Sequence, residues 1–549
     1  MTQNTPQAPR RFVLPRPVLP HTMLNLSVAT YLVALLNFGF WARLWAQFPD
    51  APAKAAVFGI AVWALTLLLL ELLGPSRLQK PVAAALIMIA ASAQYYERNL
   101  GVLIDREMVR NILETTPAES RHLITPAMVQ AILLWGCLPA ALVFWPKVLR
   151  LPLRHQLWRW PLGVGLCAAL MVGALFADYK DYSSMLRTRH DLMGAYQPGA
   201  SLWAVGRFAR EEWKTADPVA APVGRDARPG PHLAGADKPV LLVLFIGETV
   251  RAQNFGLNGY ARDTTPGLRQ RGVINFSDVA ACGTSTAVSV PCMFSPVSRA
   301  EYSREAYLGN ETLLDVLAHA GVAPLWWDNN TGDQRVAART GWSFVDATMA
   351  ADACVEECTD EAFLPIIEST LATLQTNTVL VMHMIGSHGP SYYLRYPADK
   401  AQFLPECRTS QFSDCTTEEI VNAYDNSILQ TDRVLSRTID MLAASDRVIP
   451  ALLYMSDHGE SLGETGLYLH AAPAFMAPEE QTRVPFVMWL SDRFTRTMGL
   501  ATPCLSALAD RGVSHDNLFH TVLGLMNIET SVRDDALDLT AGCRGKELL

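Results

Sequence analysis

Polar residues that follow separate apolar runs in the C-terminal half of the chain could together carry out metal-assisted chemistry. Glu248 ends the run VLLVLFIGE, and Asp457 and His458 lie in ALLYMSDHGE. Two carboxylates and an imidazole suit Zn²⁺, and a hydroxyl oxygen can complete a four-ligand set. We therefore expect a zinc site formed by Glu248, Asp457, His458 and the oxygen of Thr286.

The hydroxyl comes from ACGTSTAVSVPCMF, residues 281–294, which is a hydroxyl-rich turn between Cys282 and Cys292. A turn fixed at both ends can hold one hydroxyl in a constant position, and a hydroxyl beside a metal ion can act as a nucleophile. Thr286 is the predicted nucleophile. The alternatives within the same turn are Thr284, Ser285 and Ser289.

Two histidines remain near this set. His388 follows the run VLVMHMIGSHG, and His470 lies twelve residues after His458. An imidazole at such a site can contact a phosphate, protonate a leaving oxygen or hold a second metal ion. The residues alone leave these three roles open.

A sheet is needed to bring these residues together. Short apolar runs alternate with helical segments, which predicts an α/β domain with a parallel sheet covered on both faces. Ligand sites in such sheets lie beyond the carboxyl ends of the strands, where each of these polar residues falls. The predicted strands are Val240–Ile246, Thr378–Met384, Ala451–Met455 and Pro485–Leu490, and the predicted helices include Leu313–Ala320 and Ile420–Ala443.

The N-terminal part is apolar enough to cross a membrane. Its five apolar runs approach or reach the roughly 20 residues that a spanning helix needs, and Trp and Tyr lie near several of their ends. We expect five transmembrane helices. The runs are Leu24–Trp45, Ala55–Leu73, Pro81–Tyr96, Thr125–Trp145 and Leu157–Ala177.

The distribution of Lys and Arg predicts the orientation. Basic residues cluster in the N-terminal tail and in the loops after the second and fourth runs, which places these segments in the cytoplasm. Five spans then put the C-terminal half outside the cytoplasm, and no cleavable signal peptide is evident. The predicted division is a transmembrane domain at 1–178, a bridging helix and flexible linker at 179–239, and a catalytic domain at 240–549.

Charge and cysteines agree with an exported domain. The net charge of −8 argues against nucleic-acid binding. Cys137 and Cys167 fall in predicted spans and are expected to be free, whereas eight cysteines fall in the outer half. We expect these eight to form local disulfides. The expected pairs are 282–292, 354–358, 407–415 and 504–543.

Several segments resemble signatures of the lipid A phosphoethanolamine transferases, a family within the alkaline phosphatase/sulfatase superfamily that includes the mobile colistin-resistance enzymes. The segments are FIGETVRAQNFGLNGY, ACGTSTAVSVPCMFS, HMIGSHGPSYYLRYP and YMSDHGESLGETGLYLHA. The resemblance implies a five-helix α-helical transmembrane domain joined to a periplasmic α/β sulfatase-like domain with a central, mostly parallel sheet. It implies an inner-membrane enzyme that transfers phosphoethanolamine from phosphatidylethanolamine through Thr286 to a lipid A phosphate, and so confers polymyxin resistance. It also implies zinc at Glu248, Thr286, Asp457 and His458, with a second, weaker site left open.

The same resemblance implies substrate-binding residues. Asn111, Thr115 and Glu119 recur every four residues, a spacing that places them on one helical face where the family binds its donor. His388 and His470 match the histidines that line the ethanolamine-phosphate site. In WWDNNTGDQRV, Thr331 matches a serine-type position, while Gln334 stands where similar enzymes commonly carry Lys, and Arg335 could replace that charge.

Four alternatives compete with this interpretation. Lipoteichoic acid synthases have a similar layout but transfer glycerophosphate, and a core sugar of lipopolysaccharide is another conceivable acceptor. A sulfatase is disfavoured because no CxPSR-like or SxPSR-like motif is present. A silent membrane-tethered sensor would not need nucleophile and ligands together. We expect a monomer that binds membrane lipids and no nucleic acid.

Overall fold

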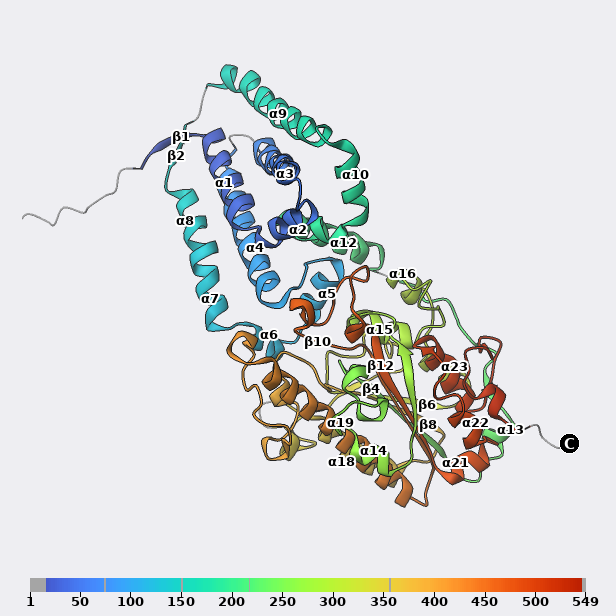
Figure 1. Cartoon of the computed structure of the whole chain (residues 1–549). Coiled ribbons are helices and arrows are strands. Elements are labelled where there is room, and N and C mark those ends of the chain that lie inside the picture. Colours follow the sequence, from blue (N-terminus) through green and yellow to red (C-terminus); the bar gives the residue numbers. More distant parts are fainter. Residues whose placement is uncertain (1–15, 74–75, 150–151, 217, 355–356, 546–549) are drawn as a thin grey trace, which may run out of the picture. The chain divides into compact units, whose positions relative to one another are not determined.

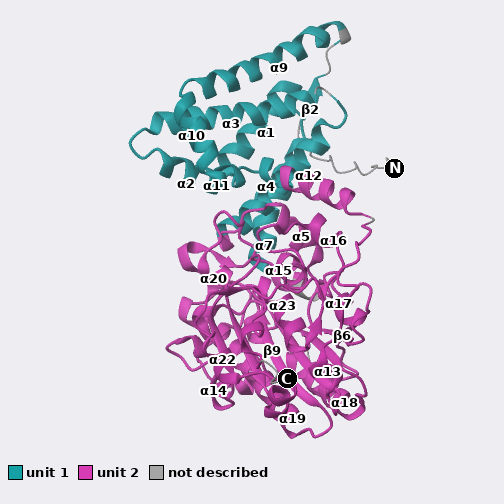
Figure 2. Ribbon diagram, turned by 90° about the vertical axis from the view of Figure 1, so that its right-hand side faces the viewer, with its two compact units in different colours: residues 1–98, 126–202 teal, residues 99–125, 203–549 magenta. Residues whose placement is uncertain are grey.

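The structure, a computed structural model, describes residues 16–73, 76–149, 152–216, 218–354 and 357–545. The chain forms two compact units, drawn in teal and magenta in Figure 2. Unit 1 contains residues 1–98 and 126–202, and unit 2 contains residues 99–125 and 203–549. The loop between the third and fourth predicted spans thus belongs to the same compact unit as the C-terminal half.

Unit 1 is helical, as its apolar runs predict. Within the part of the chain that the structure describes, three helices are long and apolar enough to cross a membrane, and a pair of helices bent by 64° gives up to four candidate spans. The three are Pro52–Leu72 (α3), Pro126–Phe144 (α7 Pro126–Ile132, a π-helical turn at Leu133–Cys137, and α8 Leu138–Phe144) and Arg154–Phe176 within α9 (Leu153–Phe176). The bent pair is α1 (His21–Leu35) and α2 (Phe38–Gln47).

The third predicted span lies in α4 (Gln79–Leu100). This helix is long, but it is less apolar than the three candidate spans, with Lys80 near one end and Glu97 and Arg98 near the other. The structure therefore gives a helical membrane-spanning region without fixing the count at five. Three shorter helices follow α9, namely α10 (Tyr179–Thr188), α11 (His190–Gly194) and α12 (Gly199–Lys214).

Unit 2 is built on an eight-stranded sheet (Figure 1). The strand order is β13-β5-β12-β9-β4-β8-β6-β7. The central strands are β4 (Val240–Gly247), β8 (Thr378–His383), β9 (Ile449–Ser456) and β6 (Ala323–Asp328). The others are β5 (Ile274–Ala280), β12 (Arg483–Leu490), β13 (Val513–Ser514) and β7 (Ser343–Phe344).

Four central strands run parallel and end at the same level. Gly247 of β4 pairs with Ser456 of β9, and His383 of β8 pairs with Asp328 of β6. The predicted strand at 485–490 is β12, which runs antiparallel to both β9 and β5. The sheet is thus mixed. β12 begins at the edge of the sheet where its neighbours β5 and β9 end.

Both faces of the sheet are buried, which explains why β4 is apolar at every position. Leu242, Leu244 and Ile246 face one core, and Leu241, Val243 and Phe245 face the other. This alternation follows from the two-residue period of a strand. The first core is completed by residues of α15 (Thr286–Met293), α17 (Leu313–His319) and α23 (Asp516–Leu525), and the second by α18 (Phe363–Thr373) and α19 (Thr417–Ala444).

The segment predicted as a flexible linker is packed instead. Ala221 exchanges backbone hydrogen bonds with Gly309 and Glu311, and β3 (Arg228–Pro229) pairs with β14 (Ile528–Glu529). Leu233 in α13 (Pro231–Ala234) is buried in the first core. The Pro and Gly residues mark turns here, while the apolar residues between them hold the segment against unit 2.

The expected disulfides are formed. Sulfur–sulfur bonds join Cys282 to Cys292, Cys354 to Cys358, Cys407 to Cys415 and Cys504 to Cys543, and Cys137 and Cys167 are free. All eight bonded cysteines lie in unit 2.

Candidate metal centre and nucleophile

Three predicted ligands meet at the carboxyl ends of β4 and β9. Glu248 follows β4 directly, and Asp457 and His458 follow β9. The pairing of Gly247 with Ser456 brings both strand ends to one level, and Asp457 N donates to Gly247 O. Each of the three side chains is fully buried and offers a ligand atom within 4.8 Å of the others.

Thr286 joins this cluster from the start of α15. Its Oγ1 donates to Glu248 Oε2 at 3.0 Å and lies 3.4 Å from His458 Nε2. The other hydroxyls of the turn have different partners: Thr284 Oγ1 donates to Ala472 O, and Ser289 Oγ accepts from Gly283 N. Among the described contacts of the turn, the oxygen of Thr286 is the one that touches the cluster.

The protonation of His458 fits a metal ligand. His458 Nδ1 lies 2.9 Å from Gly459 O, and a carbonyl oxygen can only accept a hydrogen bond, so Nδ1 carries the proton. The lone pair of Nε2 then faces Glu248 Oε1 at 3.4 Å and Asp457 Oδ2 at 3.3 Å. Burial lowers the pKa of His458, which keeps the ring neutral.

Asp457 supplies a second sign of a cation site. Its Oδ1 accepts hydrogen bonds from Thr249 N and His458 N, whereas Oδ2 is buried and accepts none from any residue that the structure describes. A buried carboxylate oxygen without a donor is costly unless a cation neutralises it. With Glu248, His458 and Thr286 Oγ1, this oxygen completes an O,O,O,N set that fits Zn²⁺.

The two remaining predicted histidines line the same site. The ring centroid of His470 lies 4.6 Å from that of His458 and 5.1 Å from that of His388. Burial, followed by the neighbouring His470, holds the pKa of His388 well below its usual value. Glu460 Oε2 accepts from His470 Nδ1 at 2.9 Å, and its Oε1 accepts from the Tyr392 hydroxyl at 2.7 Å.

Asn330 is a site residue that the sequence prediction missed. Its Nδ2 donates to Glu248 Oε2 at 2.7 Å and to Met384 O at 2.9 Å. Asp328 holds the start of this loop by accepting from Asn330 N, and its other oxygen binds His383 Nδ1 at 2.8 Å. The sequence does contain a signal for Asn330, because this residue follows an apolar run in WWDNNTGDQRV. The prediction took only Thr331, Gln334 and Arg335 from that segment.

In the described hydrogen bonds, the predicted residues Thr331 and Gln334 of that loop contact each other and Tyr307, not the proposed metal ligands. Gln334 Nε2 donates to Thr331 Oγ1 at 3.1 Å, and Gln334 O accepts from Tyr307. Arg335 is exposed, and both Gln334 and Arg335 have positive φ angles of 48° and 66°. Their roles toward a substrate stay predictions.

The predicted single helical face of Asn111, Thr115 and Glu119 is wrong. Asn111 lies in α5 (Arg106–Glu114), Thr115 caps the end of this helix, and Glu119 belongs to a second helix, α6 (Pro117–Leu123). Pro117 lacks an amide proton and disfavours helical geometry at the residue before it, so the first helix ends there. The side chain of Glu119 lies outside the described residues.

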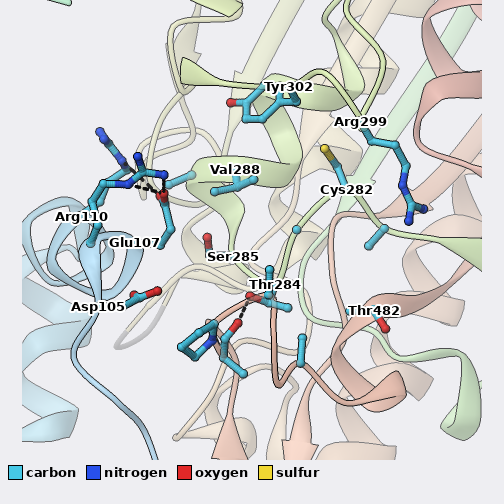
Figure 3. A pocket seen from close by; sticks show the side chains of 18 of the residues that line it. Asp105, Glu107, Arg110, Cys282, Thr284, Ser285, Val288, Arg299, Tyr302 and Thr482 are labelled. Carbon is cyan, nitrogen blue, oxygen red and sulfur yellow. Dashed lines mark hydrogen bonds and ion pairs between the residues drawn. The ribbon is translucent and has the colours of Figure 1, made fainter. Parts of the chain in front are cut away.

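A cavity of about 650 Å³ adjoins the nucleophile turn (Figure 3). Thr284, Ser285 and Val288, on either side of Thr286, line it together with Arg106 and Arg110 of α5. Arg110 is buried and pairs with Glu211 at 2.5 Å and Glu212 at 2.8 Å, both from α12. These ion pairs hold α5 where it forms one wall of the cavity.

Known proteins share this architecture along the whole chain. A family profile described as Sulfatase matches residues 241–528, and one described as Phosphoethanolamine transferase EptA/EptB matches residues 62–213. Phosphoethanolamine transferase EptA of Escherichia coli K12 is 37% identical over 542 residues, covering 97% of this chain and 98% of its own. Phosphatidylethanolamine transferase Mcr-1 of E. coli is 34% identical over 560 residues, covering 99% and 100%.

A solved structure agrees with these matches. The integral membrane protein lipooligosaccharide phosphoethanolamine transferase A (EptA) from Neisseria meningitidis superimposes with a TM-score of 0.92 at 33% identity, covering 96% of this chain and 100% of that one. The C-terminal half is therefore a sulfatase-type α/β domain, joined to a membrane-spanning region. With relatives above 30% identity along its whole length, the chain belongs to the phosphoethanolamine transferase family of EptA and Mcr-1.

Proposed function

We propose that this protein transfers phosphoethanolamine from phosphatidylethanolamine to a phosphate of lipid A through a covalent intermediate on Thr286. The observation that carries the proposal is the position of Thr286 Oγ1, at 3.0 Å from Glu248 Oε2 and 3.4 Å from His458 Nε2. Membership of the family supports the substrate class, since the relatives are named for phosphoethanolamine transfer. Splitting the transfer lets two bulky lipids use one site in turn.

In the first half-reaction the Thr286 oxygen attacks the donor phosphorus. The new bond joins that oxygen to phosphorus, the bond to the diacylglycerol oxygen breaks, and the hydroxyl proton ends on diacylglycerol. The Glu248 carboxylate accepts the hydrogen bond of the attacking hydroxyl. His470 is held through Nδ1 by Glu460, so Nε2 is the nitrogen that can pass a proton to the leaving oxygen.

In the second half-reaction a phosphate oxygen of lipid A attacks the phosphothreonine. A phosphorus–oxygen–phosphorus linkage forms, the bond to Thr286 breaks, and the acceptor's proton returns to the threonine oxygen. We assign His388 and His470, whose ring centroids lie 5.1 Å apart, to contacting the phosphate or moving a proton in this step. The cavity next to Ser285 and Val288 provides space for part of a lipid substrate.

The proposed cofactor is Zn²⁺ held by Glu248, Asp457, His458 and Thr286, with a second, weaker site left open. A bound zinc ion would lower the pKa of the threonine hydroxyl and neutralise charge on the phosphoryl oxygens. We further propose five spans, an inner-membrane location with the catalytic domain at 240–549 in the periplasm, and a monomer. Donor contacts are proposed for Asn111, Thr115 and Glu119, and substrate contacts for Thr331 and Gln334. Arg335 is the residue that could supply the positive charge that similar enzymes carry near Gln334.

Mass spectrometry of the purified full-length protein tests the proposal. After incubation with phosphatidylethanolamine, the peptide containing Thr286 should gain about 123 Da, the mass of a phosphoethanolamine group by formula. A gain of about 154 Da would instead indicate glycerophosphate transfer. No gain on this peptide under turnover would refute the assigned intermediate.

The cellular consequence follows from charge. Phosphoethanolamine adds an amine to a lipid A phosphate, which reduces the net negative charge that attracts cationic peptides. Cells producing the wild-type protein should therefore tolerate more polymyxin than cells producing Thr286→Ala. Equal susceptibility would contradict the resistance phenotype.

A further inference from the structure

His515 bridges two parts of the active site that follow strands separated by β12. Thr286 follows β5, whereas Asp457 and His458 follow β9, and β12 lies between these two strands in the sheet. Because β12 is antiparallel, its chain arrives at this edge at Arg483 and contributes no strand end carrying a ligand. The nucleophile turn and the Asp457–His458 segment are therefore one strand apart, and contacts beyond the strand ends also set their separation.

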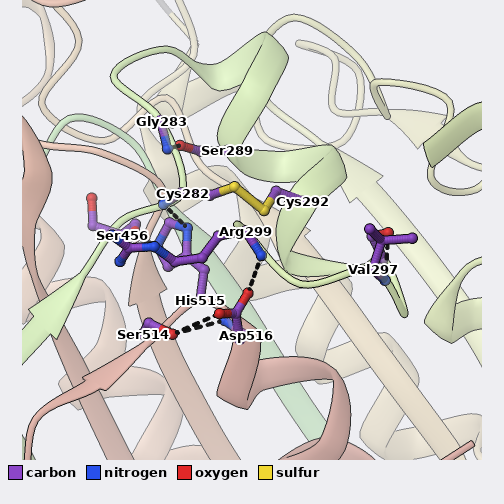
Figure 4. The surroundings of a disulfide bond; sticks show 11 residues. Cys282, Gly283, Ser289, Cys292, Val297, Arg299, Ser456, Ser514, His515 and Asp516 are labelled. Carbon is purple, nitrogen blue, oxygen red and sulfur yellow. Dashed lines mark hydrogen bonds between the residues drawn. A yellow bond between two sulfur atoms is a disulfide. The ribbon is translucent and has the colours of Figure 1, made fainter. Parts of the chain in front are cut away.

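The imidazole of His515 makes such a contact with each side (Figure 4). Cys282 N, at the start of the nucleophile turn, donates to His515 Nδ1 at 3.1 Å. His515 Nε2 lies 3.0 Å from the carbonyl oxygen of Ser456, the last residue of β9. The ring thus spans from the disulfide-bonded end of the turn to the residue before Asp457.

These partners determine the protonation of the ring. A backbone amide can only donate and a carbonyl can only accept, so Nδ1 must be bare and Nε2 must carry the proton. The ring is completely buried, and burial is the main reason that the pKa of His515 falls to about 4. A neutral ring with one defined tautomer is therefore maintained at neutral pH.

The backbone of His515 is itself held in place. His515 N donates to Ala280 O at the end of β5, where Ser514 of β13 pairs with Ala280. The next residue, Asp516, accepts from Arg299 N at 2.6 Å. Because the backbone of His515 is held in place, its ring can fix the positions of Cys282 N and Ser456 O, which it contacts.

We infer that His515 is a positioning residue that sets the distance between Thr286 and the Asp457–His458 strand end. This inference rests on the proposed nucleophilic role of Thr286. The threonine oxygen contacts Glu248 at 3.0 Å, and a displacement of about 0.5 Å takes such a contact out of the hydrogen-bonding range. Loss of His515 therefore slows the attack on phosphorus and leaves donor binding largely unchanged.

A matched pair of variants tests this role in the full-length protein. His515→Gln keeps an acceptor and a donor on one planar group, whereas His515→Met has a similar length and neither. His520→Met is the control, because His520 lies in α23, the helix that His515 precedes, is buried, and accepts a hydrogen bond from Asp534 N through Nδ1, away from the nucleophile turn. The rate at which phosphatidylethanolamine modifies the Thr286 peptide is measured at a series of donor concentrations, which gives kcat and KM for loading.

We expect His515→Met to lower kcat for loading about 10- to 100-fold with KM within about twofold of wild type, as second-sphere changes at metal sites do. His515→Gln should recover to within about threefold of wild type, and His520→Met should keep the wild-type kcat despite a similar drop in Tm. Loading by His515→Met at the wild-type rate, or an equal loss in His520→Met, would overturn the inference. No loading of the wild-type peptide would instead refute the proposed function itself.

Ring nitrogen chemical shifts give a second measurement if His515→Met does not fold. With ¹⁵N-labelled histidine, the signals that disappear in His515→Gln belong to His515. They should show a protonated Nε2 and a bare Nδ1 at pH 7. A protonated Nδ1 would break the hydrogen bond from Cys282 N and overturn the inference.

Discussion

The ligand cluster and the α5–α6 segment are positioned in opposite ways. Glu248 and Asp457 follow neighbouring parallel strands, so the sheet register sets their separation within one residue step. The α5–α6 segment consists of two short helices held by side-chain ion pairs, with Arg110 bound to Glu211 and Glu212 of α12. Backbone ladders thus position the proposed chemistry, whereas side-chain contacts position the proposed donor-binding residues.

This difference in how the two regions are positioned predicts which substitutions should reduce activity most. A ligand at a strand end has no alternative position, because moving it would disrupt the buried core on both faces of the sheet. A residue on α5 or α6 can move with its short helix when a side-chain ion pair weakens. We therefore expect the effects of substitution to decrease from the nucleophile outward to this segment.

The largest effect should come from Thr286→Ala. Removing the nucleophilic oxygen should lower transfer to lipid A by at least about 10³-fold, as for other covalent catalysts. Thr284→Ala is the matched control, because its hydroxyl binds Ala472 O and does not touch the ligands. Lipid A mass spectrometry measures both, and full activity in Thr286→Ala would exclude it as the nucleophile.

The next effect should come from Asn330→Ala, which removes the amide that orients Glu248. Zinc affinity should fall about 10- to 100-fold, the usual cost of losing a second-sphere partner. Thr331→Ala, one residue away, should change it by less than about threefold. Competition with a zinc-binding dye gives both constants, and equal values for the two variants would show that the amide does not orient Glu248.

A smaller effect is expected for Glu460→Gln. The charge that fixes His470 is lost, while the amide oxygen can still accept from Tyr392, so kcat should fall about tenfold with little change in KM. Glu464→Gln is the control, since Glu464 pairs with Arg251 instead. Steady-state transfer assays on both proteins would contradict this role if their kcat values coincide.

The smallest effect should come from Glu357→Gln, which tests how α6 is held. Glu357 binds His122 near the end of α6 at 2.6 Å and Arg395 at 2.5 Å, and Arg395 Nε donates to His388 O. Loosening this link should raise KM for the donor about two- to fivefold and leave kcat within about twofold, because the strand-borne ligands stay in place. Donor titrations give both constants, with Glu361→Gln as the control because Glu361 instead lies near Arg437. A kcat loss as large as that of Glu460→Gln would remove the contrast between the two regions.

The stability of the same variant should depend on pH. Burial opposes ionisation of Glu357, but hydrogen bonds from His122 and Arg395 and the Arg395 charge overcome it and lower the pKa from 4.5 to about 2. A lowered carboxyl pKa stabilises the fold above the unfolded value of about 4.5 and loses that effect as the pH falls toward 2. Thermal unfolding should show the Tm difference between Glu357→Gln and wild type at pH 7, and that difference should shrink by pH 3.5. A difference that stays constant would exclude the ion pair as its cause.

The two regions also differ in how far sequence could predict them. The proposed ligands were predicted together because a carboxylate or imidazole directly after a buried parallel strand must lie at the carboxyl edge of the sheet, where ligand sites form. Asn330 and His515 were missed because they act through hydrogen bonds to residues far away in the chain, which leave no regular spacing. The α5–α6 face was predicted wrongly because a four-residue repeat was read as one helix across Thr116 and Pro117.

Core burial explains the remaining errors. The linker at 216–239 was predicted to be flexible from its Pro and Gly content, yet Leu233 is buried and holds it in place. The antiparallel direction of β12 could not be read from its apolar run, because buried strands look alike in either direction.

Because β4 and β9 end at the same level, their alignment also determines where insertions and deletions in the sequence can be tolerated. Deleting one residue within β4 would pull Glu248 back by about 3.3 Å and turn its side chain to the opposite face. Related proteins should therefore gain and lose residues in stretches such as 346–353, where the main chain is outside the ladder, and keep the spacing from Val240 to Glu248 constant. Length variation in a set of homologues is thus a map of which parts the ladder holds.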